Sequence, residues 1–544
     1  MSIIKFDNFD PLKNLGAPKS GGGFNATGFA VQLAKQIIRA GQNRKMQKRM
    51  EEQREQYEKE VEEAVRNPPP IHGSARWATE DDLRKAGYLK PVTAFDTPSS
   101  IFLGLLRHPQ TQQVLGQLHW DKVGHLITVA ATQKGKSSTL VVPNLLRYRG
   151  SCVVLDPKGE LYRDTAAWRR TLGPVYNIAP FREGTDSFDP LAPIKTISDA
   201  RAMAGVLIPE DPKAQSFFRD DAIAFLAAVI LSVAESAPKN HRTMQEIRSI
   251  TAGDGMLKYA LELVATGRPE LANPAKIVLG KRPESLSTLM QTLNTHLSIF
   301  DEASLSANTG NTVDFRTLKD QTTTVYINVP FGKMSTYSPY LRLVLSTALD
   351  AMLLNEKKPD IPVLFLLDEF LSLKHFPEFR DAIRTHTSAG VRLWFFLQNQ
   401  ATLEEYYPNS WKAFFDATVK VFFGTEDTHT GRLVSDLLGN TTVAHLQASY
   451  SQNTSTPSGG MTEQGGNTGQ SLNTNLAYSQ RPLLTPTEVE ALLNEDFPDH
   501  SRNAILKIGG APYPIQAKLE PWFNGPICKS RVNFKAPEQI SKER

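Results

Sequence analysis

The sequence of 544 residues predicts an α/β protein with a mostly parallel central sheet, an all-helical insertion and a charged N-terminal helix. Two short apolar runs, 125–130 and 151–156, flank a helical pattern at 135–149, which is the strand–loop–helix–strand order of a parallel sheet. Strand-like runs then nearly vanish between residues 197 and 305. Four apolar runs follow, with helical patterns between them: 323–330, 363–370, 391–398 and 418–425. We therefore expect the sheet to be built from both sides of a helical insertion.

The composition is that of an ordinary globular protein. Hydrophobic residues make up 40% and charged residues 22% of the chain, and the net charge of +4 indicates no global basic field for nucleic acid. The two cysteines, Cys152 and Cys528, lie far apart, which argues against a disulfide scaffold and for a reducing compartment. No apolar window long enough for a transmembrane helix and no signal-peptide pattern is present.

The N-terminal region, residues 1–71, is predicted to be a flexible end followed by a helical arm. Residues 1–24 are expected to be flexible, and residues 28–66 predict one long helix that the prolines at 68–70 stop. Its first half is basic and its second half acidic, through Arg44, Lys45, Lys48 and Arg49 and then Glu58, Glu60, Glu62 and Glu63. Such a charge run is usually a solvated helix face, and an arm that binds a partner or nucleic acid is the alternative.

The stretch 29–41 at the start of this helix is short and amphipathic, with Lys35 and Arg39 inside it. We expect a helix that packs or meets a partner, and an interfacial membrane helix is the alternative.

The segment ATQKGKSST, residues 131–139, nearly matches the phosphate-loop pattern G-x-x-x-x-G-K-[ST]. Gly135, Lys136 and Ser137 match, and Ala130 stands in place of the first glycine. A Gly-Lys-Ser triplet can arise by chance, but this one follows an apolar run and opens a helix, within which Pro143 predicts a kink or an early stop. We interpret it as a working loop, because alanine is tolerated at the first position if its φ stays negative. No G-x-G-x-x-G follows a strand, so a Rossmann site is excluded.

Each residue of the loop has an expected role. A phosphate would be surrounded by the backbone N–H groups of Thr132, Gln133, Lys134, Gly135, Lys136, Ser137 and Ser138. Lys136 would reach the β- and γ-phosphates, and the Ser137 hydroxyl would bind Mg²⁺.

The segment PVLFLLDEF supplies the acids that such a loop needs, since Asp368 and Glu369 directly follow a buried apolar run. Asp368 would hold Mg²⁺ through water, and Glu369 would polarise the attacking water. A strand that simply ends in a helix-capping acid is the alternative. No Cys/His cluster has metal-site spacing, so this Mg²⁺ is the one metal that we expect.

Two further strand ends carry polar residues. Gln398 ends the run at 391–398 and could sense the γ-phosphate, or simply cap the sheet. Asp156, Lys158, Gly159 and Glu160 follow the run at 151–156, either as a polar turn or as support for the site or a subunit contact.

These features predict five regions. They are the N-terminal region 1–71, the first part of the nucleotide-binding domain 72–196, the all-helical domain 197–305, the second part of the nucleotide-binding domain 306–525, and a C-terminal tail 526–544. Residues 448–479 are rich in Ser, Thr, Asn, Gln and Gly, so we expect a disordered loop there.

With these motifs in place, the sequence resembles the coupling-protein ATPases of type IV secretion and conjugation, over about residues 72–520. The segments that carry the resemblance are HGSARWATEDDLRKAGYL (72–89), ATQKGKSSTLVVPNLL, VVLDPKGELYRDTAAWRR, FDPL (188–191), LLDEFLSLKHFPEF, FGTEDTHTGRLVSDLLGNTTV and, after the polar tract, RPLLTPTEVEALL (481–493). Members of that family often also vary the first glycine of the loop.

The resemblance implies a RecA-like P-loop NTPase that hydrolyses ATP with Mg²⁺ and assembles as a homo-hexamer, with a monomer in solution as an open alternative. It implies that single-stranded DNA with a relaxase, or effector proteins, pass into a secretion channel. The partners would be the channel ATPases and the inner-membrane components, and the location the cytoplasm or the cytoplasmic face of the inner membrane.

The sequence departs from the family in two places. Members usually begin with transmembrane helices, whereas this chain begins with a charged helix, so we expect a soluble subclass or anchoring by another subunit. The position nearest the family's Gly-Arg pattern reads Thr387-Ser388, so the trans-acting arginine is not fixed. The arginines nearby are Arg380, Arg384 and Arg392, of which we choose Arg384 as the candidate.

The leading hypothesis is therefore an ATP-driven motor that couples DNA or relaxase-bound DNA to the channel. The alternatives are a coupling ATPase for protein effectors and a nucleotide-binding recruitment platform with little turnover. The intact Lys136, Asp368 and Glu369 argue against the platform.

Overall fold

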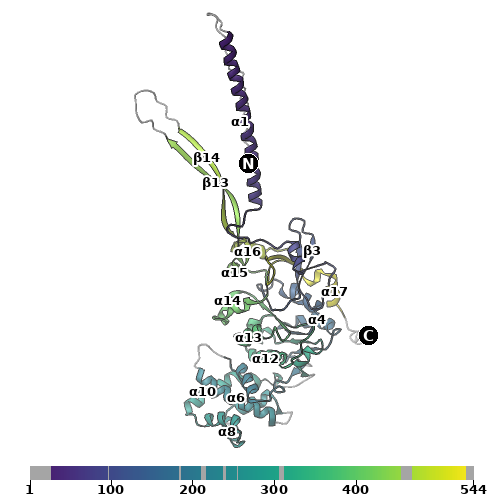
Figure 1. The fold of residues 1–544 in the computed structure, drawn as a ribbon. Helices are drawn as coiled ribbons and strands as arrows, with labels where there is room; N and C mark the ends of the chain where they lie inside the picture. The colour runs from purple at the N-terminus through teal and green to yellow at the C-terminus, as the bar shows by residue number, and fades with distance from the viewer. Residues whose placement is uncertain are drawn as a thin grey trace. The chain divides into compact units, whose positions relative to one another are not determined.

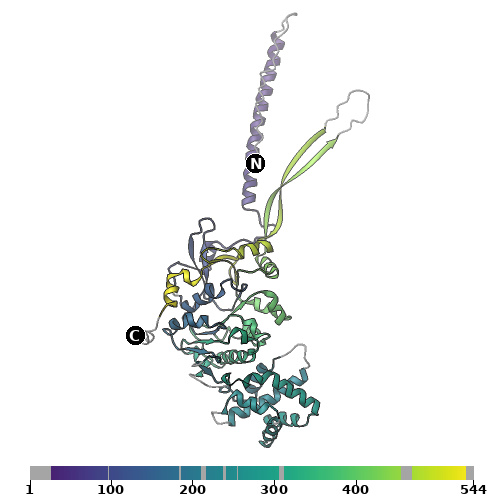
Figure 2. The ribbon, with the colours of Figure 1, turned by 180° about the vertical axis from the view of Figure 1, so that it is seen from behind.

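The computed structural model of the chain describes residues 26–95, 97–182, 185–209, 216–236, 241–253, 255–305, 312–454 and 468–534. The chain forms two compact units, seen in Figure 1 and from behind in Figure 2. The first unit contains residues 1–72 and 442–480, and the second contains residues 73–441 and 481–544.

The second unit is built around a large sheet, which has twelve strands within the described ranges. These strands are β1 (Leu89–Lys90), β2 (Ile101–Arg107), β3 (Val114–Trp120), β4 (Leu126–Val129), β5 (Cys152–Leu155), β6 (Val175–Ile178), β9 (Thr324–Ile327), β10 (Val363–Leu367), β11 (Val391–Leu397), β12 (Val419–Phe422), β15 (Arg502–Ile508) and β16 (Ile515–Leu519). Their order is β1-β3-β2-β16-β15-β12-β4-β11-β10-β5-β9-β6. From β12 to β6 every neighbouring pair is parallel, which confirms the predicted mostly parallel centre.

The central strands are apolar along their whole length because both faces of the sheet are covered. All five residues of β10 and all seven of β11 are buried. Along β5 the side chains alternate, so that Val153 and Leu155 enter one hydrophobic core while Cys152 and Val154 enter another. The sheet therefore separates two cores, and it is fixed in place by packing on both sides.

Helices follow most of the central strands and connect them. In the sheet-bearing part these are α2 (Glu80–Lys85), α3 (Val142–Arg147), α4 (Glu160–Arg169), α11 (Phe331–Met334), α12 (Ser338–Leu354), α13 (Pro377–Thr385), α14 (Gln400–Tyr406), α15 (Thr428–Leu438), α16 (Pro486–Leu493) and α17 (Pro526–Val532). The return of the chain through a helix after each strand is what makes parallel pairing of the next strand possible.

Antiparallel strands extend the sheet on the β12 side, and the sequence analysis did not predict them. β15 pairs antiparallel with β12, β16 with β15, and β2 with β16. The strands closest to the C-terminus thus lie between the parallel centre and the early strands β2, β3 and β1.

Within residues 197–305 the described regular elements are all helices, joined by short turns. The helices are α5 (Ile197–Leu207), α6 (Ser216–Ser236), α7 (Met244–Thr251), α8 (Gly255–Ala265), α9 (Pro269–Leu279) and α10 (Pro283–Leu297), with short 3₁₀ turns after them. Every residue from Phe225 to Leu231 of α6 is buried, as expected for a helix with neighbours all round. In Figure 1 the labels α6, α8 and α10 lie together at one end of the second unit, beyond α12.

The two ends of this helical segment are held together. The short strand β7 (Ser187–Phe188) precedes it and β8 (Thr312–Val313) follows it, and the two strands pair in parallel. The helical segment therefore begins and ends beside one short strand pair, which is separate from the large sheet.

The first unit contains a long helix and a hairpin. Helix α1 (Ala26–Arg66) has 41 residues and ends just before the prolines, as predicted. Residues 1–24, expected to be flexible, lie outside the described residues. None of the described helices is long and apolar enough to cross a bilayer.

The polar tract 448–479 differs from the prediction of a disordered loop. Strands β13 (Asn440–Thr454) and β14 (Thr468–Pro482) pair with each other and occupy most of it, while residues 455–467 lie outside the described residues. The prediction considered only that a polar tract buries little apolar surface. A two-stranded ribbon also gains its backbone hydrogen bonds, and the threonines and Tyr450 and Tyr478 favour strands.

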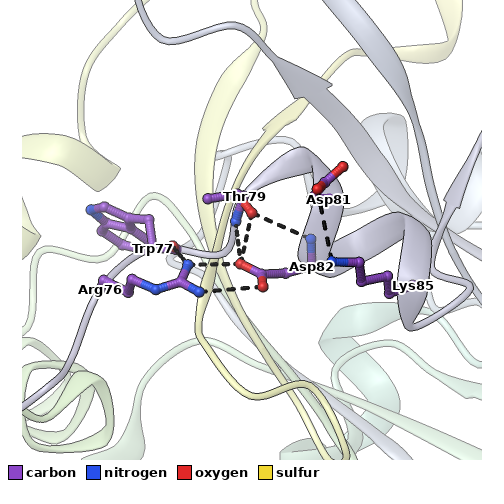
Figure 3. Close-up of polar contacts among 6 residues, drawn as sticks. All are labelled: Arg76, Trp77, Thr79, Asp81, Asp82 and Lys85. Carbon is purple, nitrogen blue, oxygen red and sulfur yellow. Dashed lines mark hydrogen bonds and ion pairs between the residues drawn. The ribbon is translucent and has the colours of Figure 1, made fainter.

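The segment before the sheet is folded by local polar contacts (Figure 3). Thr79 caps α2, accepting from the backbone N–H of Asp82, whose carboxylate accepts from the backbone N–H of Thr79. Arg76 donates to the same carboxylate, from Nη1 to Oδ2 at 2.7 Å and from Nη2 to Oδ1 at 3.2 Å. The Arg76 guanidinium holds the pKa of Asp82 well below its usual range. These contacts fix the conformation of residues 76–82, near the start of the second unit.

Candidate functional site

The predicted phosphate loop begins where β4 ends, at Val129. Two loop residues take left-handed backbone conformations, Gln133 with φ of 62° and Gly135 with φ of 91°. Ala130 is absent from the described residues with positive φ, which is the condition under which alanine can replace the first glycine. The turn of the loop is thus made at positions 133 and 135.

Lys136 is buried and bends back onto its own loop. Its Nζ donates to the carbonyl oxygens of Ala130 at 2.9 Å and Ala131 at 3.4 Å. Burial lowers the pKa of Lys136, and the nearby carboxylates of Glu369 and Asp368 oppose that shift. The lysine is therefore held in place before any ligand arrives.

The helix after the loop starts with a wide turn. Residues Ser137–Val141 are π-helical, with the Val142 N–H donating to the Ser137 carbonyl, and α3 follows and ends at Arg147. Pro143, expected to cause a kink or an early stop, lies in the first turn of α3, where its missing N–H costs little. The irregularity predicted for this helix thus takes the form of a π turn before the proline.

Asp368 lies at the end of β10, beside the first residue of this helix. The Ser137 hydroxyl donates to Asp368 Oδ2 at 3.3 Å. The other oxygen, Oδ1, is buried and has no hydrogen-bond partner among the residues that the structure describes. Burial, together with the charge of Glu369, raises the pKa of Asp368 to about 6. A buried carboxylate with one unused oxygen is suited to a cation.

Glu369 and Gln398 form a second polar contact in the same place. Gln398 follows β11, the strand between β4 and β10, and its Nε2 donates to Glu369 Oε2 at 2.7 Å. The Thr132 hydroxyl of the loop donates to Gln398 Oε1 at 3.1 Å. Glu369 itself has a left-handed backbone, with φ of 59°, which is unusual for a residue other than glycine. A chain of two hydrogen bonds thus links the loop to Glu369.

These residues surround a pocket of about 240 Å³. Its lining consists of Thr132, Gln133, Gly135, Lys136, Ser137, Ser138, Asp156, Pro157, Lys158, Glu160, Leu161, Phe331, Asp368 and Glu369. Pockets of about 500 and 490 Å³ lie elsewhere, against the helical segment, and neither contains a residue of the loop. We locate the candidate site in the smaller pocket because it alone of these three combines the loop with the acids.

Part of the segment from Asp156 to Glu160 lines this pocket. The Asp156 carboxylate is buried and accepts from the Tyr162 N–H at 2.8 Å, and burial raises its pKa. Gly159 has φ of 73°, and a Cβ atom there would lie 2.9 Å from Nη2 of Arg182. Asp156 and Gly159 therefore shape the turn that brings Lys158 and Glu160 to the pocket.

The end of β12 supports the loop from the other side, which the sequence analysis did not predict. Gly424 has φ of 54°, and its carbonyl accepts from the Ala131 N–H at 3.1 Å. The Lys134 side chain packs on Gly424, where a Cβ atom would approach it to 2.6 Å, and its Nζ pairs with Glu426 at 2.7 Å. Lys134 is the one of the seven predicted loop residues that does not line the pocket, and its side chain anchors the loop to the end of β12.

The arginine candidates lie away from this pocket. Arg384 is exposed near the end of α13, next to Ile383, whose carbonyl contacts His125 Nε2 at 3.1 Å at the start of β4. It is therefore near the opposite end of the parallel strands from the loop. Arg392 is buried and donates to the Ser99 and Lys122 carbonyls, so it is a structural residue.

Comparison with known proteins agrees with this fold. The family model "Type IV secretory system Conjugative DNA transfer" matches residues 76–542. The conjugal transfer protein TraG of Escherichia coli is 26% identical over 531 residues, covering 87% of this chain and 80% of that protein. Protein VirD4 of Agrobacterium fabrum is 27% identical over 475 residues, covering 83% of this chain and 66% of that protein.

Solved structures are similar as well. The bacterial conjugative coupling protein TrwBΔN70 in complex with sulphate superposes with a TM-score of 0.55 at 16% identity, covering 73% of this chain and 85% of that one. TrwB in complex with ADP and Mg²⁺ gives a TM-score of 0.56 at 15% identity, covering 82% of this chain and 94% of that one. These likenesses and the sheet described above confirm the RecA-like α/β fold. Because the family model matches most of its length, the chain belongs to the type IV secretory system conjugative DNA transfer family.

Proposed function

We propose that the chain is an ATP-hydrolysing coupling motor of a type IV secretion or conjugation system, which recruits DNA or relaxase-bound DNA and drives it into the channel. Membership of the conjugative DNA transfer family supports this proposal. The single observation that carries it is the convergence of Lys136, Ser137, Asp368 and Glu369 on one pocket, with Gln398 hydrogen-bonded to Glu369.

The residues of the pocket fit a nucleoside triphosphate with Mg²⁺, and solved structures of TrwB contain ADP with Mg²⁺ or an ATP analogue. Ser137 and Asp368 would hold the Mg²⁺, because hydroxyl and carboxylate oxygens are its preferred ligands and Asp368 Oδ1 is buried without a partner among the described residues. When bound, the ion neutralises phosphate charge. Lys136 would exchange its contacts with Ala130 and Ala131 for phosphate oxygens.

Glu369 would orient the attacking water, and Gln398 would hold the Glu369 carboxylate in position for this step. Since Thr132 lies in the loop and contacts Gln398, a ligand in the loop can act on Glu369 through Gln398. No arginine lines the pocket among the residues that the structure describes, and a neighbouring subunit in a hexameric ring would supply one, with Arg384 as the candidate.

The helical segment 197–305 would meet the cargo, while residues 72–196 and 306–525 carry out hydrolysis. All the candidate site residues lie outside the helical segment. The chain would act in the cytoplasm or at the cytoplasmic face of the inner membrane, with the channel ATPases and inner-membrane components as partners.

A turnover assay tests this function directly. We would measure ATP hydrolysis with Mg²⁺, with and without single-stranded DNA, on the monomeric and oligomeric fractions of the full chain. The motor predicts turnover that DNA stimulates in the oligomer. Turnover without DNA stimulation would favour protein effectors as cargo, and nucleotide binding without turnover would indicate a recruitment platform.

A further inference from the structure

Helix α1 carries opposite charges in its two halves. The positions from 39 to 60 are all exposed. The segment 44–49 contains four basic residues and no acidic one, whereas the segment 58–63 contains four acidic residues and one basic one. On one helix, this separation of charge makes each half complementary to the other half of a second helix.

An apolar stripe runs along the same part of the helix. Met46, Met50, Tyr57 and Val61 recur at spacings of four, seven and four, which places them on one face of an α-helix. Met46 and Met50 are 63% and 62% exposed and Tyr57 is 41% exposed. A row of large apolar side chains on one helix face is rarely left exposed to solvent, and another surface usually covers it.

Contacts within the helix use only part of its charge. Arg54 pairs with Glu58 at 2.9 Å and Lys48 with Glu52 at 4.0 Å, both four residues apart and exposed. Such pairs contribute little each, so they do not explain why basic and acidic residues are segregated.

We propose that α1 pairs with α1 of a second copy of this chain, in an antiparallel arrangement centred near Gln53 and Arg54. In this arrangement the basic segment 44–49 of each copy lies beside the acidic segment 58–63 of the other. The same register brings Met46 beside Val61 and Met50 beside Tyr57, so the apolar stripes of the two copies meet. A parallel pair in register would instead place basic residues beside basic residues and acidic beside acidic.

An antiparallel pair has two-fold symmetry and uses the same surface on both copies. It is therefore a different contact from those that close a hexameric ring, in which neighbouring subunits are related by rotation about one axis. The arm joins subunits two at a time, either before they enter a ring or between two rings.

Sedimentation velocity of the full chain without nucleotide tests the pairing. We expect a dimer whose dissociation constant rises at least tenfold when NaCl is raised from about 50 mM to about 500 mM, because exposed charges are screened. A monomer at all concentrations would overturn the proposal. Association that needs added single-stranded DNA would assign the basic half to nucleic acid, and would overturn it as well.

Charge reversal separates pairing from misfolding. One variant carries Arg44→Glu, Lys45→Glu, Lys48→Glu and Arg49→Glu, and the other carries Glu58→Lys, Glu60→Lys, Glu62→Lys and Glu63→Lys. Each variant alone should lose the dimer, and an equimolar mixture should regain it. Circular dichroism of each variant checks that α1 stays helical. Dimers in each variant alone, or none in the mixture, would contradict the proposal.

Cross-linking tests the direction of the helices. Cys152 and Cys528 are buried, so new cysteines in α1 can be followed selectively. Mild oxidation of a mixture of Met46→Cys and Val61→Cys variants should give the mixed disulfide dimer in at least tenfold excess over either homodimer. A Met46→Cys homodimer as the main product would show a parallel pair and overturn the proposal.

Discussion

Gln398 holds Glu369 through a hydrogen bond of 2.7 Å from Nε2 to Oε2, and it accepts one from the Thr132 hydroxyl at 3.1 Å. Gln398 directly follows β11, which lies between the strand before the loop and the strand before the acids, so Gln398 can respond to both.

Replacing Gln398 with leucine should slow ATP hydrolysis by about 10²-fold, because Glu369 loses the group that positions it. Nucleotide affinity should change by no more than about threefold, since Gln398 does not bind the phosphate chain in the ground state. Turnover and nucleotide titration on the same preparation measure the two effects. Exposed Glu405→Gln on α14 is the control, and an unchanged turnover in Gln398→Leu would refute a positioning role.

Lys136→Ala and Glu369→Gln should both abolish most turnover for different reasons. Lys136→Ala removes a phosphate counter-charge and should weaken nucleotide binding, whereas Glu369→Gln keeps binding and loses roughly 10²–10⁴-fold in rate. Equilibrium binding of a fluorescent ATP analogue, alongside turnover, distinguishes the two. Normal turnover in both variants would rule out the proposed motor.

Asp368→Asn should stabilise the nucleotide-free protein at pH 7 by about 1–3 kcal/mol, since it removes a buried charge beside Glu369. Burial raises the pKa of Asp368 from 3.8 to about 6, so the folded state binds the proton more tightly than the unfolded state. The wild-type chain therefore loses stability as the pH rises from about 4 to about 6, and the difference from the variant develops across that window.

Chemical denaturation of the wild type and the Asp368→Asn variant at several pH values measures this difference. The variant should also lose Mg²⁺-dependent hydrolysis. One substitution would then both stabilise the protein and inactivate it. A variant that is less stable than the wild type at pH 7 would contradict the burial argument.

Gly424→Ala should displace the phosphate loop. A Cβ atom at Gly424 would lie 2.6 Å from the Lys134 side chain, and the φ of 54° is itself unfavourable for alanine. We expect a loss of about 1–3 kcal/mol in stability and weaker nucleotide binding. Gly205→Ala in α5 is the matched control, because its Cβ would meet nothing within 4 Å, and it should gain about 0.5–1 kcal/mol. Thermal unfolding of both variants gives the comparison.

Arg384→Ala should reduce turnover in assembled protein without changing nucleotide affinity, if this exposed arginine serves the site of a neighbour. A mixture of inactive Arg384→Ala and Lys136→Ala subunits should then recover part of the activity, because intact sites and intact arginines meet at some interfaces. Arg380→Ala, one turn earlier on α13, is the control. A mixture as inactive as its components would remove Arg384 from this role.

The central strands could be predicted because each is apolar on both faces, as at Phe365 and Leu366 of β10, which enter opposite cores. The strands on the β12 side escaped prediction. β2 is interrupted by Gly104, where the pairing with β3 shifts register, and β15 and β16 carry Lys507 and Lys518 within short runs. Contacts with neighbouring strands determine the position of such strands more than their own hydrophobic pattern does.

The candidate site shows the same division. Lys136, Asp368 and Glu369 could be predicted because their chemistry fixes both residue type and place in the chain. Gly424 and Glu426 could not, because their role is to support Lys134, and that contact depends on which strand lies next to β4. A polar pair with a large separation in sequence carries no local pattern.

The position of β4 in the sheet also bears on how the protein is made. Its two neighbours are β11 and β12, so the strand that precedes the phosphate loop finds no partner until residue 391 and beyond have left the ribosome. During synthesis the apolar faces of β4 and β5 stay unpaired while the whole helical segment is made, because the strands that pair with them come after it in the chain. Pairing over such separations is slow, and exposed apolar strands aggregate in the meantime. We therefore expect nascent chains that stop before β11 to need a chaperone, and the ability to bind nucleotide to appear late in translation.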